Sequence, residues 1–377
     1  MRILPFVIII LIIVALVIYL DNQPLQQEAT TGQESGTQPA VSQETVPRRS
    51  PLHAGDLAMP TTAIDTNELP ELVIPADNDD ADKPLPVYQL APDTYMFFGN
   101  VSQLDLQNRG ANANAGFVIT NAGVVVIDTL GTPRLGRRLI STIRAMTDQP
   151  ITHLIITHNH PDHAYGAVAF ADLEGVTIIG HRGVVDYIGS QINEESVNHR
   201  REMLPEDMRG FDTVRPDVLI GAERFSSQQI TVGDRTFVLY NTGAHHSYGD
   251  LVIHQVEDNI VWISDLAFNQ RLTYVGDGNS QQIIEGLDWL LKSFGSAVLM
   301  VPGHGSAQTV PFPMVVKTRD YVQRLRDLMA KAVEDDVDMY DAVKQTEFPD
   351  WRDTRLYEEN HGRNVQFVYR EMALLLF

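Results

Sequence analysis

Residues 157–163, with the sequence THNHPDH, combine residue types and spacings suited to holding a metal ion. Four of them have metal-binding side chains: His158, His160, Asp162 and His163. The segment follows the apolar run 154–156, which is typical of the end of a strand. The backbone just past a strand is extended, so the two histidines of His-x-His point the same way. Pro161 favours the first position of a helix, which would turn the following aspartate and histidine toward the same space.

This spacing indicates a metal site. Imidazole and carboxylate ligands suit zinc, and iron or manganese would accept the same set. One pair of ligands can hold one ion, and the second pair can hold another beside it. A solvated, histidine-rich turn is the alternative interpretation, and the position directly after an apolar strand disfavours it.

Three later segments contain further candidate residues. His246 lies in residues 243–250 (GAHHSYGD), Asp265 follows the apolar run 260–263, and His304 lies in a PGHG turn after another apolar run. With the earlier H-x-H-x-D-H pattern, these motifs occur in the order seen in the metallo-β-lactamase superfamily. The chain resembles that superfamily from about residue 86 to its C-terminus.

The resemblance implies a fold and a ligand set. The expected fold is α/β (α+β), a metallo-β-lactamase-like αββα sandwich of two mixed β-sheets flanked by helices. The expected ligands of one ion are His158, His160 and His246. The expected ligands of the second ion are Asp162, His163 and His304, and Asp265 would bridge the two ions. The expected cofactor is zinc, two ions per chain.

The implied chemistry is hydrolysis. Two dications, two aspartates and a bridging hydroxide sum to a local charge of about +1. Zinc lowers the pKa of bound water to roughly 7, and the resulting hydroxide would attack a carbonyl while the metals stabilise the oxyanion. Asp162 is the catalytic candidate, because it could orient the hydroxide or pass on its proton. The expected small-molecule substrate is an ester, thioester, lactone or β-lactam.

Asp265 also bears on the branch of the superfamily. True metallo-β-lactamases commonly have cysteine or serine at this position, so a carboxylate is more similar to the glyoxalase II, lactonase and thioesterase branches. The chain is most similar to bacterial zinc metallohydrolases described as quinoprotein relay system or sulfur-oxidation-associated proteins. That similarity is carried by residues 115–118, 125–129, 265–268 and 364–367.

Two other functions stay open at the level of sequence. One is a mononuclear iron enzyme resembling persulfide dioxygenases, which a full set of seven ligands disfavours because that chemistry needs one ion with open positions. The other is a metal-binding or redox-partner module without turnover.

Several residues near the motifs are weaker candidates. Asp128, which ends a strand, could hydrogen-bond a ligand histidine or simply cap the strand end. Tyr165 and Tyr248 could donate to an oxyanion, although buried or rim tyrosines are common. The side chain of His245 is expected to point away from its neighbouring ligand, and Asn159 is expected to be a turn residue.

The composition of the chain limits the classes of partner and ligand that it can bind. The chain has 377 residues, 44% of them apolar, which is enough for a substantial core. A formal charge of −21 argues against nucleic acid, whose phosphates would be repelled. The chain has no cysteine, which excludes disulfides, thiolate ligands and a lipid-modified N-terminal cysteine. Composition does not predict the oligomeric state.

The first residues predict export. Residues 3–20 are almost wholly apolar and uncharged, and at 1.5 Å per residue they would span roughly 27 Å. No pair of small residues suits cleavage, so a signal-anchor over residues 1–21 is preferred to a removed signal peptide. Arg2 precedes the apolar run, which places the bulk of the chain outside. The expected location is the bacterial inner membrane, single-pass, with the catalytic domain in the periplasm, or the periplasm itself if the signal is cleaved.

The remainder divides into two parts. Residues 22–84 are polar and acidic and predict a disordered linker, because they bury too little apolar surface. Residues 85–377 form the expected catalytic domain. Its pattern predicts strands at its start and around each motif, hairpin turns, amphipathic helices and a polar, helical or irregular insertion over residues 184–216, where the family varies its substrate-facing insertions. The predicted hairpin turns are at residues 121–123, 233–235 and 257–259. One predicted helix starts near Thr132, and the others include residues 283–291, 322–329 and 364–376.

Overall fold

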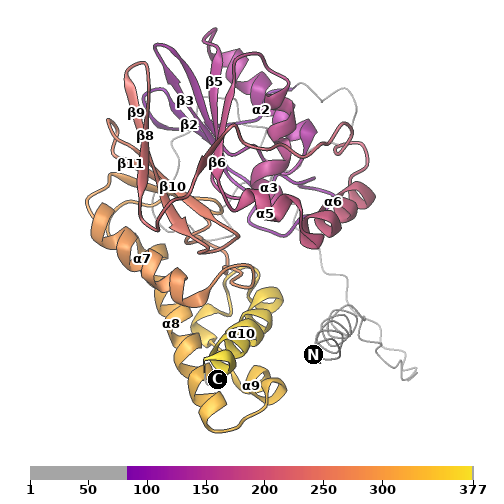
Figure 1. The fold of residues 1–377 in the computed structure, drawn as a ribbon, viewed down its shortest axis with the longest axis vertical. Helices are drawn as coiled ribbons and strands as arrows, with labels where there is room; N and C mark the ends of the chain where they lie inside the picture. Colours follow the sequence, from indigo (N-terminus) through magenta and orange to yellow (C-terminus); the bar gives the residue numbers. More distant parts are fainter. Residues whose placement is uncertain (1–82, 376–377) are drawn as a thin grey trace, which may run out of the picture. The chain divides into compact units, whose positions relative to one another are not determined.

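The structure, a computed structural model, describes residues 83–375, whose strands form two mixed sheets (Figure 1). The seven-stranded sheet is antiparallel from β1 to β4 and parallel from β4 to β7. Its strands are β1 (Tyr88–Ala91), β2 (Thr94–Phe97), β3 (Ala115–Thr120), β4 (Gly123–Ile127), β5 (Ile151–Ile156), β6 (Thr177–His181) and β7 (Val218–Ile220).

The five-stranded sheet has the order β12-β11-β10-β9-β8. It is antiparallel except for the parallel pair β11 and β12. Its strands are β8 (Ser227–Val232), β9 (Arg235–Gly243), β10 (Asp250–Gln255), β11 (Ile260–Ser264) and β12 (Leu299–Pro302). The predicted hairpin turns at residues 233–235 and 257–259 therefore join neighbouring antiparallel strands.

Helices cover the outer face of each sheet (Figure 1). Those that follow strands of the first sheet are α2 (Pro133–Met146), α3 (Pro161–Ala164), α4 (Val168–Ala171), α5 (Val184–Ile188) and α6 (Gln191–Met203). Those on the second sheet's side are α7 (Ser280–Phe294), α8 (Pro313–Glu334), α9 (Met339–Gln345) and α10 (Tyr357–Leu374). The predicted αββα sandwich is confirmed.

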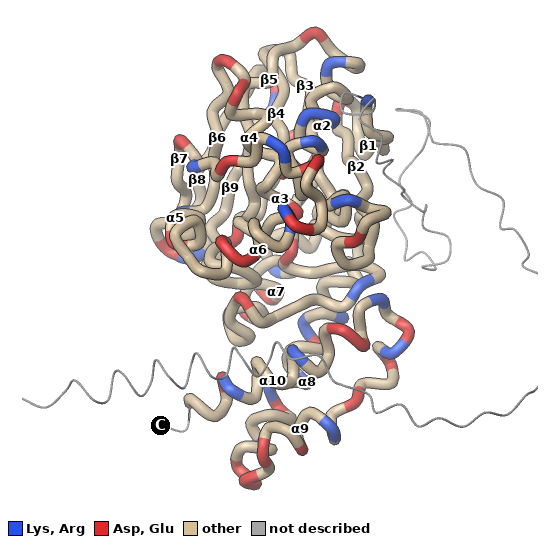
Figure 2. Tube along the Cα trace, turned by 90° about the vertical axis from the view of Figure 1, so that its right-hand side faces the viewer, with Lys and Arg blue, Asp and Glu red and all other residues tan. Residues whose placement is uncertain are grey.

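Alternation along the strands builds three apolar layers. In β4, Val125 and Ile127 face the second sheet, whereas Val124 and Val126 face α2. Side chains two positions apart lie on one face of a strand, so an uninterrupted apolar run serves both layers. Charged residues lie mainly on helices and loops (Figure 2). This distribution is expected because burying an unpaired charge between the layers would be costly.

Local sequence signals explain some element boundaries and not others. Thr132 accepts a hydrogen bond from Leu135 N and caps α2, as its position before a proline predicted. The last helix begins at Tyr357, earlier than the predicted start at residue 364. The prediction missed this start because the first two turns are polar and lack an apolar period. The short strand β7 was not predicted, since three residues are too few to show alternation.

The predicted signal-anchor, residues 1–21, lies outside the described residues, as does the predicted linker up to residue 82. Both stay predictions, together with the membrane location. From residue 83 to residue 375, no helix is long and apolar enough to cross a membrane. Leu85 is buried, and its backbone N–H donates to Thr142 Oγ1 at 2.6 Å, so the chain packs against α2 from that point.

The contact between the sheets generates a stability prediction. Gly116 in β3 faces Trp262 in β11, and a Cβ at Gly116 would lie 2.2 Å from the indole ring. Gly116→Ala should therefore overpack the space between the sheets and lower the free energy of unfolding by about 1–3 kcal/mol in chemical denaturation. Gly189→Ala is the matched control, because no atom lies within 4 Å of its Cβ position and its φ is −87°. Equal stability of the two variants would contradict this sheet packing.

Candidate metal centre

Loops at the ends of strands from both sheets bring the candidate ligands together. Residues 157–163 run from the end of β5 into the short helix α3. His246 lies between β9 and β10, Asp265 directly follows β11, and His304 follows β12. The parallel strands β4 to β6 and the pair β11 and β12 end at the same edge of the sandwich, so residues far apart in sequence meet there.

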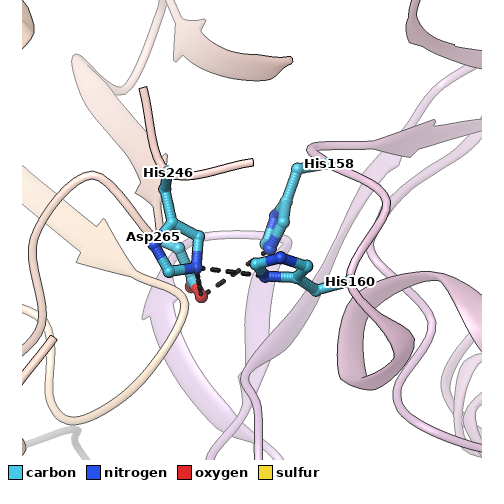
Figure 3. A group of neighbouring side chains, drawn as sticks. All are labelled: His158, His160, His246 and Asp265. Carbon is cyan, nitrogen blue, oxygen red and sulfur yellow. Dashed lines mark hydrogen bonds and ion pairs between the residues drawn. The ribbon is translucent and has the colours of Figure 1, made fainter. Parts of the chain in front are cut away.

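All seven predicted site residues lie in this cluster, in two groups. Within each group, one ligand atom per residue lies within 4.8 Å of the others. The groups are His158, His160, His246 and Asp265, and Asp162, His163 and His304. Figure 3 shows the three rings of the first group converging on the carboxylate of Asp265.

Asp265 contacts both groups. Its Oδ2 lies 3.2 Å from Nε2 of His246, 3.3 Å from Nε2 of His304 and 3.7 Å from Nε2 of His158. Its Oδ1 lies 3.3 Å from Nε2 of His163. One carboxylate is therefore shared by four imidazoles.

The donor atoms themselves test whether a metal fits. His158 Nε2, His163 Nε2 and Asp265 Oδ1 are buried and make no well-aligned hydrogen bond to any part of the chain that the structure describes, although His163 Nε2 and Asp265 Oδ1 lie 3.3 Å apart as an ion pair. Buried polar atoms normally have partners, and leaving them without one costs free energy. A divalent cation accepts lone pairs from just these atom types, so the residues present fit the metal that the arrangement implies.

The electrostatics of the cluster also demand positive charge. Burial would raise the pKa of Asp265, but the neighbouring His304 and His163 outweigh it and hold that pKa well below its usual value. Burial would lower the pKa of His163, but the carboxylates of Asp265 and Asp128 raise it well above its usual value. The carboxylates thus favour positive charge at this ring, and binding of a metal through Nε2 would require that nitrogen to be deprotonated.

The outer ring nitrogens of three histidines have hydrogen-bond partners that orient the rings. His163 Nδ1 lies 2.8 Å from Asp128 Oδ2, and His304 Nδ1 lies 2.7 Å from the carbonyl oxygen of Asn112. His158 Nδ1 lies 3.2 Å from Thr157 Oγ1. Each contact leaves Nε2 directed toward the centre, as ligand histidines require.

Asp128 fills both roles considered from the sequence. Besides meeting His163, its carboxylate accepts hydrogen bonds from the backbone N–H and the hydroxyl of Thr157, both at 2.8 Å. It therefore ties the end of β4 to the start of the metal-binding segment. Its φ of 60° is in the left-handed region, which aspartate tolerates better than most residues.

Asp162 is one of two partly exposed candidate ligands, the other being His160. The side chain of Asp162 is 13% exposed, whereas the side chain of Asp265 is 3% exposed. Asn112 Nδ2 donates to its Oδ2 at 2.7 Å. Burial opposes ionisation, but the charges of His163 and His304 lower the pKa of Asp162 and keep it ionised at neutral pH.

Of the residues that the sequence had offered as weaker candidates, His245 belongs to neither metal-binding group. His245 Nε2 lies 3.1 Å from the carbonyl oxygen of Ile283, so its ring turns toward α7 as expected. Tyr165 donates to Asn193 Oδ1 at 2.9 Å.

Sequence reasoning missed several residues beside the centre. Arg271 Nη1 lies 3.0 Å from His304 Nδ1, and the guanidinium also covers the ring of Phe268. The ring of Phe268 meets the rings of His246 and His304 edge-on. Arg271 and Asn112 lie in loops without a distinctive pattern, and Phe268 lies in residues 265–268, which the sequence marked only for their similarity to one branch of the superfamily.

Comparison with known proteins agrees with this geometry. The family model described as "Metallo-beta-lactamase superfamily" matches residues 108–304. The chain belongs to the metallo-β-lactamase superfamily. This fold implies a divalent metal, typically zinc, and the superfamily resemblance stated from the motifs is confirmed.

Two relatives are similar to parts of this chain. The metallo-β-lactamase IND-1 of Chryseobacterium indologenes is 22% identical over 196 residues, 51% of this chain and 72% of that protein. A linear primary-alkylsulfatase of Pseudomonas sp. (strain ATCC 19151) is 35% identical over 54 residues, 14% of this chain and 10% of that protein. These relatives are hydrolases of the superfamily, and the expectation that this chain is a hydrolase of the same superfamily is confirmed.

A structural likeness supports the fold. The stereoselective inverting sec-alkylsulfatase Pisa1 from Pseudomonas sp. superposes with a TM-score of 0.62 at 17% identity, over 76% of this chain and 50% of that one. This chain thus spans about half the length of that alkylsulfatase. At such identity the match shows a shared fold.

The contacts of Asp128 generate a second prediction. Asp128→Asn replaces an acceptor-only group with an amide that must turn a donor toward Thr157 or His163. The variant should lower the free energy of unfolding of the metal-free protein by about 1–3 kcal/mol in chemical denaturation. Asp234→Asn is the control, because this exposed carboxylate likewise accepts from a backbone N–H, that of Asn121, but far from the centre. If both variants match the wild type, Asp128 does not hold the strand ends together.

Proposed function

We propose that this protein is a dinuclear zinc-dependent hydrolase that cleaves a carbonyl substrate of the ester, thioester, lactone or β-lactam type. The observation that carries the proposal is the position of Asp265, whose carboxylate lies within 3.7 Å of histidines from both groups. A carboxylate so placed suits a bridge between two ions. The proposed ligands are His158, His160 and His246 for one ion, Asp162, His163 and His304 for the other, and Asp265 for both.

The chain's own residues would contribute binding and orientation. When bound, the zinc ions would polarise the substrate carbonyl and bring the pKa of water close to neutrality, to roughly 7. Asp162 is ionised and partly exposed, so it can orient the attacking water by accepting a hydrogen bond, whereas its lowered pKa makes it a weak acceptor of the water's proton. The hydrogen bond from Asn112 fixes the orientation of that carboxylate. Phe268 covers one side of the His246 and His304 rings and keeps water from them.

The presence of two ligand groups supports a dinuclear hydrolase over the alternative functions. The donor set consists of imidazoles and carboxylates, which zinc, iron and manganese all accept. A mononuclear iron enzyme needs one group of ligands, and the second group of three would then lack a role. A metal-binding module without turnover would have no use for a partly exposed, ionised Asp162 beside the centre.

Hydrolysis of an alkyl sulfate ester is a second candidate. The structural match to a sec-alkylsulfatase over 76% of this chain and the local similarity to a primary alkylsulfatase favour it. Kinship with the quinoprotein relay system and sulfur-oxidation-associated metallohydrolases is also part of the proposal. It is supported by the carboxylate at residue 265 and by the four segments that resemble those proteins.

Metal analysis and a substrate panel test the proposal together. The purified protein should contain close to two zinc ions per chain by elemental analysis. It should hydrolyse at least one member of a panel of esters, thioesters, lactones, β-lactams and alkyl sulfates, and a chelator should abolish that activity. One tightly held iron with no second ion after zinc loading would favour the oxygenase alternative. Two zinc ions without turnover of any panel member would favour a binding module.

Substitution of Asp265 tests the bridge. Asp265→Asn removes one negative charge and a contact common to both groups, and a neutral amide is a poor metal ligand. One ion should be lost or bound much more weakly, and turnover should fall by orders of magnitude, because orientation of the water depends on both ions. Asp288→Asn, on the exposed face of α7, is the control and should behave as wild type. Full turnover with two retained ions in Asp265→Asn would refute the bridge.

A further inference from the structure

The ring of His160 is oriented differently from the other rings of the cluster. Its Nδ1 lies 3.1 Å from His246 Nε2, so Nδ1 is the nitrogen on the inner side (Figure 3). Its Nε2 faces outward and lies 3.2 Å from Oδ2 of Asp277. The rings of His158, His163 and His304 present Nε2 inward, with Nδ1 in contact with the surrounding chain.

Asp277 reaches His160 from a distant part of the chain. It lies in the segment between β11 and α7, which also contains Asp265, Phe268 and Arg271. The side chain of Asp277 is 30% exposed and that of His160 is 15% exposed, so the pair stands at the rim of the buried cluster.

The backbone around Asp277 is held against a second ligand segment. A Cβ at Gly278 would lie 2.0 Å from the carbonyl oxygen of His245, so the loop passes too close to residues 245–246 for any side chain there. The backbone N–H of Asn279 donates to the same carbonyl oxygen at 3.4 Å. The loop that presents Asp277 is therefore packed on the segment that presents His246.

We infer that Asp277 is a positioning residue for the ion held by His158, His160 and His246, which it serves by accepting the Nε2–H of His160. This inference rests on the proposed metal centre. A neutral imidazole carries one N–H, so donation from Nε2 leaves the Nδ1 lone pair free to face the ion. A carboxylate acceptor also increases the basicity of the ring, and removing such a partner typically weakens metal affinity by about 10–100-fold.

The competing interpretation is a rim ion pair without effect on metal binding. Partly exposed pairs of this kind often contribute little to stability. The two interpretations differ in the expected effect of removing the carboxylate. Loss of a positioning residue changes the affinity for the ion while the metal-free protein keeps its stability, whereas loss of a rim ion pair changes neither.

Zinc titration of the full-length protein against a chelator of known affinity tests the inference. Asp277→Ala should lower the affinity for one of the two ions by about 10–100-fold and leave the other close to wild type. Asp277→Asn keeps an acceptor without its charge and should give a smaller loss. Asp288→Ala is the matched control, because it removes an acidic side chain from the neighbouring helix α7 that is paired with Arg319. It should bind both ions as the wild type does.

Two further measurements separate positioning from a general structural role. The melting temperature of metal-free Asp277→Ala should equal that of metal-free wild type. In the zinc-loaded wild type, ¹H–¹⁵N spectra should show a protonated Nε2 on His160, and this signal should weaken or vanish through exchange with water in Asp277→Ala.

Three results would overturn the inference. Wild-type affinity for both ions in Asp277→Ala would show that the carboxylate has no part in metal binding. A lower melting temperature of that variant without metal, in proportion to its lost affinity, would assign Asp277 a structural role alone. Absence of zinc binding in the wild-type protein would refute the proposed function itself. This result is distinguishable from the other two because it is obtained without any variant.

Discussion

The buried carboxylate of Asp265 is the constraint on which the rest of the site depends. A carboxylate that is 3% exposed is stable only if positive charge surrounds it, since burial strongly disfavours the charged form. Four imidazoles lie within 3.7 Å of it. Cations between these groups would satisfy the carboxylate and the unpaired ring nitrogens at once.

The two-sheet sandwich places this carboxylate at the end of a strand. Strands of both sheets end at the same edge of the sandwich, where β5, β11 and β12 each lead into a loop that contains ligands. The sheets hold a fixed separation because large side chains interlock, as Trp262 does over Gly116. Loops on such a scaffold can vary in sequence while their starting points stay in place, which is how one fold serves β-lactamases and alkylsulfatases.

A second layer of contacts orients the ligand rings. Asp128, Asn112 and Asp277 come from three separate loops, and each meets the outer nitrogen of a different histidine. Imidazole rings would otherwise rotate and exchange tautomers, and a ligand set without this layer would bind metal weakly. The loop between β11 and α7 contributes to both layers, because it contains Asp265 and Asp277.

The sequence by itself determined the metal-binding segment, the order of the motifs and the fold class. His158 and His160 share a side because the extended backbone repeats every two residues, and apolar alternation marks the strands that carry the layers. Tertiary structure decided which residues outside the motifs contact and orient the ligand rings. Asp277 lies 117 positions from His160, and its neighbours Gly276 and Gly278 resemble any turn, so no local pattern announces it. Such contacts depend on how two loops pack on one another, which is a property of the folded chain and not of any short stretch of it.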